Sequence, residues 1–410
     1  MPRILVVGSG TAGTAAVEEC ARQGADATVI DRLDEPEPPW ASWPDLVGLE
    51  GQSRTVSSTL DQEPPSASIL GTEVVAVREG EVVASNGSHF RADSVVIAAG
   101  SRFEPPTAQG IRKLGSFVLD SAARYEEFGS ASASADRILI CGEGARGLQV
   151  AERLSARGAR PSLMVSSWQR GRPSPPVFDV VSDAARAKGI GLRPGWVGRV
   201  VGLARVEAVI AGGDVLPCDA LAFIPRRVPV PIRLAASPGR SGGVLVDRYL
   251  RAKVPRVFAA GGCAELDRSL PPGATLVDEP RLSGRAAGAN SAGGDISVGL
   301  LRTWSLSVFG LRWSRVGPDA LTCESLGMDV REVGRRWSGS SACSLVYERG
   351  TGRVIGAEVI EPADFTSLSL GSSASGTATL RSLAYGHPGS SDISVVSDTA
   401  RLGLKSWSRC

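Results

Sequence analysis

Residues 4–16 read ILVVGSGTAGTAA, and this stretch decides the fold of the amino-terminal part of the chain. An apolar, β-branched run leads into Gly8, Gly10 and Gly13, and a helix-like stretch follows. In such a turn, glycine permits a tight bend, a close approach of the backbone to a pyrophosphate, and close packing of helix on strand. The helix N-terminus then offers N–H groups and the positive end of its dipole to the phosphates. The stretch predicts a dinucleotide-binding strand–turn–helix unit.

The same pattern recurs at Gly142, Gly144 and Gly147, again after an apolar run and before a helix-like stretch. Asp31 closes the strand that follows the first copy, where an acid binds the ribose hydroxyls of an adenosine. One glycine motif is a weak signal, because short patterns recur by chance. Two copies, each between a strand and a helix, predict that one chain binds two dinucleotides.

Composition sets the broad class of the protein. The 410 residues are 42% hydrophobic, with a mean hydropathy of +0.03 and a net charge of +2. No apolar run reaches the roughly 18–20 residues of a membrane span, and the N-terminus lacks a signal-peptide pattern. We therefore expect a cytoplasmic protein with no membrane span. Interspersed charges argue against a nucleic-acid partner.

Cysteine and histidine usage argues against a structural metal site. The seven cysteines are scattered without metal-ligand spacing, and the chain has two histidines. We expect most of the cysteines to be small buried residues in a reducing compartment.

Further strands and turns extend the pattern beyond the two motifs. Residues 94–100 and 257–262 each run from a buried strand into glycine, and a small-residue helix follows at 281–290. From about residue 300 the pattern becomes one of alternating strands, at 304–309, 342–347 and 354–360. These elements predict an α/β fold with a distinct C-terminal part.

Taken together, these features resemble the pyridine nucleotide–disulfide oxidoreductase superfamily, in its NADH oxidase and coenzyme A disulfide reductase-like branch. The resemblance implies an α/β fold of two Rossmann-like dinucleotide-binding domains, one inserted in the other, plus a C-terminal α+β dimerisation domain. It implies an FAD-binding domain at 1–120 and 240–298, an NAD(P)-binding domain at 121–239, and the dimerisation domain at 299–410. A homodimer is therefore expected.

The resemblance also assigns cofactor-binding residues, with FAD at the first motif and NADP or NAD at the second. For FAD they are Gly8, Gly10, Thr11, Ala12, Gly13, Asp31, Arg32, Ala99, Gly100, Gly261 and Gly262. For the nicotinamide nucleotide they are Gly142, Gly144, Gly147, Ser166 and Arg170.

A C-terminal motif supplies candidate catalytic residues. His387 begins the run HPGSSD, which is similar to the His-Pro-Thr-x-Ser-Glu motif of the disulfide reductases. In that family the histidine reaches the flavin site of the partner subunit as an acid–base group. Imidazole suits the role because its pKa lies near neutrality, and the carboxylate, here Asp392, orients it. The alternative is a turn histidine before proline.

The chain departs from the family at chemically active positions. The redox cysteine is expected shortly after Asp31, but residues 39–44 read PWASWP, and no cysteine lies between Cys20 and Cys141. A thiolate is needed to pass electrons to a disulfide. Gly262 stands where the family has an aspartate on the ribityl chain of the flavin. Glu265 is either its substitute or a solvated acid at the start of a helix.

The second motif leaves the choice between NAD and NADP open. The strand after it ends in serines, Ser166 among them, rather than in an acid, and Arg170 and Arg172 follow. An acid there favours NAD, whereas serine and arginine accept a 2′-phosphate. The arginines are equally consistent with a loop surface.

Three functions remain open. The first is an FAD-dependent oxidoreductase that takes hydride from NAD(P)H and reduces a small-molecule or protein acceptor, such as oxygen, a quinone or a protein partner. The second is a thiol/disulfide reductase that uses His387 and Asp392 with a thiol in trans, from Cys410 or a substrate. The third is a catalytically degenerate structural or regulatory subunit that keeps the nucleotide-binding fold.

Overall fold

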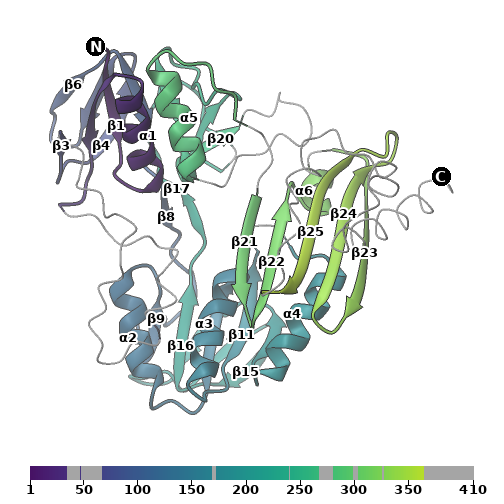
Figure 1. Cartoon of the computed structure of the whole chain (residues 1–410). Coiled ribbons are helices and arrows are strands. Elements are labelled where there is room, and N and C mark those ends of the chain that lie inside the picture. The colour runs from purple at the N-terminus through teal and green to yellow at the C-terminus, as the bar shows by residue number, and fades with distance from the viewer. Residues whose placement is uncertain are drawn as a thin grey trace. The chain divides into compact units, whose positions relative to one another are not determined.

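The computed structural model describes residues 1–34, 47, 67–168, 172–239, 241–266, 280–298, 303–325 and 327–363. These residues form two compact units, which Figure 1 labels by element. The first unit takes its residues from Met1–Pro39, Thr55–Arg102 and Arg227–Thr303, and the second from Trp40–Arg54, Phe103–Arg226 and Trp304–Cys410. The domain boundaries predicted above stay predictions.

The first unit is built on a parallel five-stranded sheet in the order β19-β7-β1-β2-β3. Its central strands are almost continuously apolar and buried, as expected of a parallel sheet covered on both faces. The strands are β1 (Arg3–Val7), β2 (Asp26–Ile30), β3 (Ser68–Ile69), β7 (Ser94–Ile97) and β19 (Val257–Ala259).

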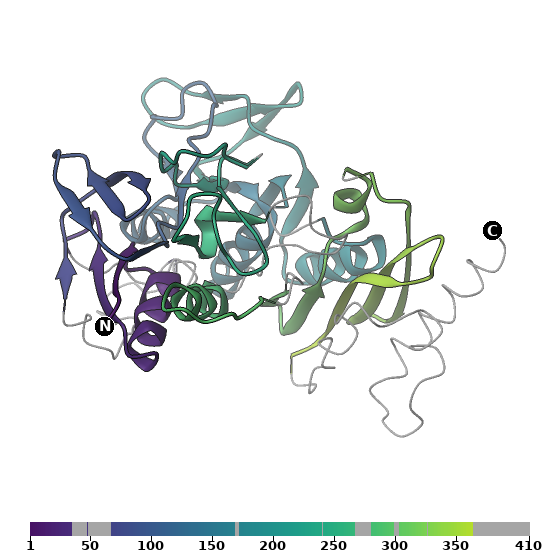
Figure 2. The ribbon, with the colours of Figure 1, turned by 90° about the horizontal axis from the view of Figure 1, so that it is seen from above.

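Two helices, α1 (Thr11–Arg22) and α5 (Pro280–Ser291), lie side by side in both views of the ribbon (Figures 1 and 2). Their backbones approach closely at glycines. A Cβ at Gly284 would lie 2.2 Å from the carbonyl oxygen of Ala12, and one at Gly288 would lie 2.4 Å from that of Ala16. The small residues of the predicted helix at 281–290 are therefore required by packing.

Short strands complete the first unit. Apolar side chains of an antiparallel meander, Val74, Val77 and Val82, join the core of the parallel sheet. The meander is β4 (Val74–Arg78), β5 (Glu81–Ala84) and β6 (His89–Arg91), and the two-stranded sheets pair β18 (Val244–Val246) with β20 (Ala264–Leu266) and β8 (Ser101–Phe103) with β17 (Arg227–Pro229).

The second unit repeats the parallel design with the order β12-β11-β10-β16-β9. All six residues of its central strand β10 are buried. The strands are β9 (Ser116–Val118), β10 (Ile138–Glu143), β11 (Ser162–Ser167), β12 (Gly191–Pro194) and β16 (Ala220–Ile224); the helices are α2 (Ala122–Ser132), α3 (Gly144–Ala156) and α4 (Pro175–Ala187); and a meander comprises β13 (Arg199–Val201), β14 (Ala208–Ala211) and β15 (Asp214–Pro217).

An antiparallel sheet, in the order β21-β22-β25-β24-β23, completes the second unit and confirms the change of pattern predicted near residue 300. Helix α4 packs against it, and Figure 1 shows its strands in green to yellow. The elements are β21 (Thr303–Val308), β22 (Leu311–Val316), α6 (Ala320–Ser325), β23 (Val330–Ser338), β24 (Ser341–Glu348) and β25 (Val354–Pro362). The predicted α/β fold class, with Rossmann-like sheets and a separate C-terminal sheet, is confirmed.

Within the described ranges, no helix combines the length and the apolar character that crossing a bilayer requires.

Candidate dinucleotide sites

The first glycine motif joins β1 to α1, and two of its glycines are required by packing. Gly8 has φ +108°, and a Cβ there would lie 2.4 Å from the carbonyl oxygen of Ala98. A Cβ at Gly13 would lie 1.8 Å from the carbonyl oxygen of Gly8. These glycines allow α1 to start directly against β1 and β7.

Gly10 has a different environment, because a Cβ there would have no neighbour within 4 Å among the described residues. It is the N-cap of α1, which has no side-chain cap and no acidic residue in its first turn. Backbone N–H groups at the start of a helix have no partner within the helix. In the part of the chain that the structure describes, nothing therefore covers the positive end of α1 beside Gly10, and this arrangement fits a pyrophosphate group.

Asp31, directly after β2, lies against the same turn. Its Oδ2 accepts hydrogen bonds from the Ser9 backbone N–H and, at 2.7 Å, from the Ser9 hydroxyl, while Oδ1 accepts one from the Leu33 N–H at 2.9 Å. The side chain of Arg32 is exposed. The structure thus brings Asp31 to the glycine turn, as an adenosine site requires. The sequence analysis did not predict that Ser9 holds Asp31, although a hydroxyl-bearing residue between the first two glycines could have indicated it.

The other predicted FAD positions lie at the carboxyl ends of neighbouring strands. Ala99 and Gly100 follow β7, and Gly261 and Gly262 follow β19. A Cβ at Gly261 would lie 2.9 Å from the Cβ of Ala12, so this turn meets the start of α1. Ligands of open α/β sheets bind at this edge. The described residues therefore fit the predicted FAD site, although the role of each residue stays a prediction.

Glu265 does not begin a helix. It lies in β20, and its carboxylate accepts a hydrogen bond from the Ser241 N–H at 3.1 Å and another from the Ser241 hydroxyl. The interpretation of Glu265 as a helix-start acid is therefore wrong, because the chain returns to extended structure after the short turn at Gly261–Cys263.

The second motif joins β10 to α3 and also packs tightly at its glycines. A Cβ at Gly142 would lie 2.0 Å from the carbonyl oxygen of Ile224, and one at Gly147 would lie 2.5 Å from Cδ1 of Leu163. A Cβ at Gly144 would lie 2.5 Å from the ring of Trp168. In this motif all three glycines, including the one equivalent to Gly10, have close neighbours.

The start of α3 is also occupied. Glu143 is the N-cap, and its carboxylate accepts hydrogen bonds from the backbone N–H groups of Ala145, at 3.2 Å, and Arg146, at 2.7 Å. Ser166 lies exposed in β11, and Arg170 lies outside the described residues. The second motif therefore has the Rossmann-like backbone but presents no open phosphate position in this arrangement. Sequence reasoning missed both Glu143 and Trp168.

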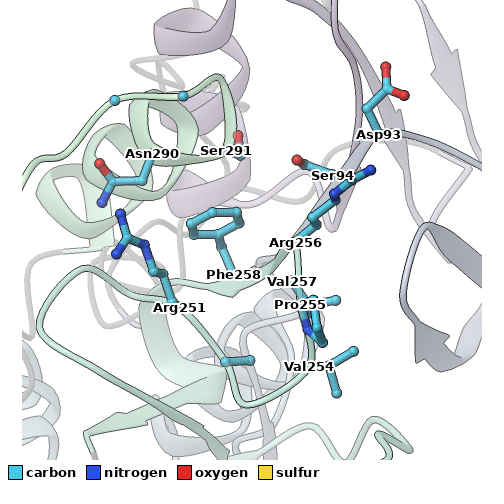
Figure 3. Close-up of a pocket in the computed structure, with 13 residues that line it drawn as sticks. Asp93, Ser94, Arg251, Val254, Pro255, Arg256, Val257, Phe258, Asn290 and Ser291 are labelled. Carbon is cyan, nitrogen blue, oxygen red and sulfur yellow. The ribbon is translucent and has the colours of Figure 1, made fainter.

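A cavity of about 440 Å³ lies at the opposite edge of the first sheet. Its lining includes Ser94 and Val257, the first residues of β7 and β19. Figure 3 shows these two residues across the cavity from Asn290 of α5, with the ring of Phe258 between them. The carboxyl ends of the strands, where the glycine turns lie, are at the other edge. This cavity is therefore separate from the predicted FAD site.

A family model described as "Pyridine nucleotide-disulphide oxidoreductase" matches residues 2–287. The chain belongs to this family. Membership confirms the predicted cofactors, FAD together with NAD or NADP.

Relatives agree with this assignment. Mercuric reductase from Acidithiobacillus ferrooxidans is 23% identical over 55% of this chain and 43% of its own length. NADH oxidase from Streptococcus pyogenes is 23% identical over 89% of this chain and 90% of its own length. The chain spans about half the length of the mercuric reductases it matches.

A solved structure shows the same fold. The water-forming NADH oxidase from Lactobacillus brevis bound to NADH superposes with a TM-score of 0.83 at 17% identity, covering 100% of this chain and 99% of that chain.

The cysteines of the described part are free and buried: Cys20, Cys141, Cys218, Cys263, Cys323 and Cys343. Burial raises the pKa of the Cys218 thiol to about 11 and that of Cys323 to about 12. Cys263 donates to the carbonyl oxygens of Ile97 and Ala260, at 3.3 Å each, as expected of a packing residue. A buried neutral thiol is a poor nucleophile.

The predicted catalytic pair, His387 and Asp392, lies outside the described residues, as do Cys410 and the loop at 39–44. Their roles stay predictions.

Proposed function

We propose that the chain is an FAD-dependent oxidoreductase that takes hydride from NAD(P)H and reduces an acceptor other than a disulfide. The observation that carries the proposal is the open start of α1 beside Gly10, with Asp31 held at the same turn by Ser9. The six described thiols are buried, which disfavours a disulfide acceptor.

The roles of the residues follow from their positions. The N–H groups at the start of α1 bind the pyrophosphate, and Asp31 accepts hydrogen bonds from ribose hydroxyls. FAD, when bound, supplies the redox chemistry, and the protein supplies position and electrostatics. Similarity to an NADH oxidase over 89% of this chain and 90% of that protein favours oxygen as the acceptor to test first, before a quinone or a protein.

The remaining predictions belong to the same proposal. The protein is a homodimer in the cytoplasm in which His387 reaches the flavin site of the partner subunit, and Asp392 orients it. The family motif at residues 387–392 favours a second candidate, a thiol route in which Cys410 or a substrate thiol takes part.

Acceptor assays distinguish these routes. The purified protein is supplied with NADH or NADPH and then with oxygen, a quinone or an aromatic disulfide, and the variant Cys410→Ser is compared with the control Ser408→Ala. We expect oxygen or quinone reduction that neither substitution changes. Disulfide reduction that Cys410→Ser alone abolishes would instead establish the thiol route. If the protein reduces none of these acceptors, the result would support the third function, a catalytically degenerate structural or regulatory subunit.

A further inference from the structure

The start of α3 is occupied by the chain's own carboxylate. Glu143 lies between the first two glycines of the second motif, and its side chain is 7% exposed. Its two oxygens accept the N–H groups of Ala145 and Arg146. These are the donors that a bound phosphate would use. A dinucleotide pyrophosphate and the Glu143 carboxylate therefore compete for the same N–H groups and repel each other.

An aromatic ring covers the same turn. Ring atoms Cε3, Cζ3 and Cη2 of Trp168 lie 2.5–2.7 Å from the position that a Cβ of Gly144 would take. At the equivalent position in the first motif, Gly10, no described residue lies within 4 Å. The two motifs share their backbone design, but one is open and the other is filled by two side chains.

The C-terminal sheet holds this ring in place. Trp168 makes an edge contact with Trp313, with ring centroids 5.7 Å apart, and Trp313 is fully buried. The indole N–H of Trp313 donates to Glu358 at 2.7 Å. Glu358 also accepts from the Ser174 backbone N–H at 2.9 Å and from Arg315 at 2.6 Å.

Arg172 and Ser174, just before α4, are bonded to the same sheet. Arg315 donates to the carbonyl oxygen of Arg172 at 2.6 Å, and Ser174 is the N-cap of α4. Arg172 and Ser174, which precede α4, are thus bonded to the C-terminal sheet. That sheet also provides the ring contact of Trp168 through Trp313.

We propose that Glu143 and Trp168 form a gate that holds the second dinucleotide site closed. A nicotinamide nucleotide reaches the start of α3 only after the carboxylate leaves the N–H groups and the ring leaves Gly144. This inference rests on the proposed function, in which NAD(P)H is the electron donor. The apparent dissociation constant of a ligand that needs an open state equals its intrinsic value divided by the open fraction. Removing either side chain therefore raises nucleotide affinity.

Calorimetric titration of the FAD-loaded, full-length protein tests the gate. ADP-ribose is the first probe, because it carries the pyrophosphate but no redox group, and NADH and NADPH follow. The variants are Glu143→Ala, Glu143→Gln and Trp168→Ala. Glu207→Gln and Trp196→Ala are the matched controls, since both residues are exposed in the same unit.

We expect Glu143→Ala and Trp168→Ala each to lower the dissociation constant at least about tenfold, with no loss of bound FAD. Glu143→Gln removes the charge but keeps an acceptor oxygen, so we expect a smaller gain. The controls leave the constant unchanged. If wild type and all variants bind the nucleotide with equal affinity while NAD(P)H still reduces the flavin, the gate is overturned but the proposed function stands. Weaker binding in the variants also overturns it, because the side chains then contact the ligand.

A second measurement uses wild-type protein and does not depend on how the alanine variants fold. Fluorotryptophan is incorporated, and the fluorine resonance of Trp168 is assigned by its loss in Trp168→Phe. We expect this resonance to shift when NADH or NADPH saturates the protein, while that of Trp196 stays in place. A Trp168 resonance that is unmoved at saturation overturns the gate. If no nucleotide binds to any form and the flavin is never reduced, both the gate and the proposed function fail.

Discussion

Replacing Gly10 by alanine separates the binding role of the first glycine motif from its packing role. Gly10 has φ −66° and ψ −178°, which any residue adopts, and a Cβ there meets none of the described residues within 4 Å. A glycine-to-alanine change at such backbone angles stabilises a protein by about 0.4–1 kcal/mol through the unfolded chain. Gly10 is also the N-cap of α1, where glycine is preferred to alanine, and this preference offsets that gain. We therefore expect the FAD-free Gly10→Ala protein to unfold close to the wild-type temperature.

FAD affinity should respond in the opposite direction. The second glycine of this motif lets the backbone approach the pyrophosphate, and the added methyl group occupies that approach. We expect the dissociation constant of FAD to rise at least about tenfold, which corresponds to about 1.4 kcal/mol.

Gly13→Ala is the matched control. Its Cβ would lie 1.8 Å from the carbonyl oxygen of Gly8, so α1 has to move away from β1. Overpacking of this severity costs about 3 kcal/mol. The assay is calorimetric unfolding of the FAD-free proteins, followed by titration with FAD monitored by flavin absorbance. Wild-type FAD affinity in Gly10→Ala, or equal destabilisation by the two substitutions, would refute the reasoning.

Three further predictions concern charges and thiols. Glu358→Ala leaves the buried guanidinium of Arg315 without its main partner and should cost about 3–5 kcal/mol in urea unfolding, whereas Glu104→Ala, in an exposed pair with Arg226, should cost less than about 1 kcal/mol. The hydrogen bond and charge of Arg137 lower the pKa of Asp219 in the folded protein from its ordinary value of 3.8. The pair therefore stabilises the fold above pH 3.8, and this stabilisation is lost as the pH falls through the pKa of Asp219 in the folded protein. Asp219→Asn should therefore reduce stability at neutral pH and match wild type once Asp219 is protonated, as paired urea titrations would detect. The six buried thiols should resist alkylation at about pH 8 in the native protein and react in denaturant, as peptide mass spectrometry would record; rapid native alkylation of Cys218 or Cys323 would contradict their burial.

Local chemistry explains which parts of the fold and site were predictable from the sequence. The glycines of both motifs act through the backbone of their own turns, and Asp31 ends the strand next to the first turn. Their positions therefore follow from spacing along the chain. The C-terminal strands were visible because short apolar runs are bounded by turn residues, as at Gly350 and Gly352 between the last two strands.

The missed features depend on residues far apart in the chain. Trp168, which lies against Gly144, contacts Trp313 of the C-terminal sheet, and Glu358 of that sheet holds the Trp313 indole. No local pattern encodes that contact. Glu143 offered a weak signal, since a negative charge near a helix N-terminus is favourable, although glutamate is not among the residues preferred as N-caps. Its significance appears only when the N–H groups it occupies are recognised as those of a phosphate site.

An anaerobic absorbance titration tests the central claim most directly. The purified full-length protein is scanned alone and then with increasing NADH or NADPH. The account predicts a flavin spectrum in the isolated protein that bleaches on addition of one of the two nucleotides, because the first site holds FAD and NAD(P)H reduces it. A colourless protein that takes up no FAD, or a flavin spectrum that neither nucleotide bleaches, would contradict the account.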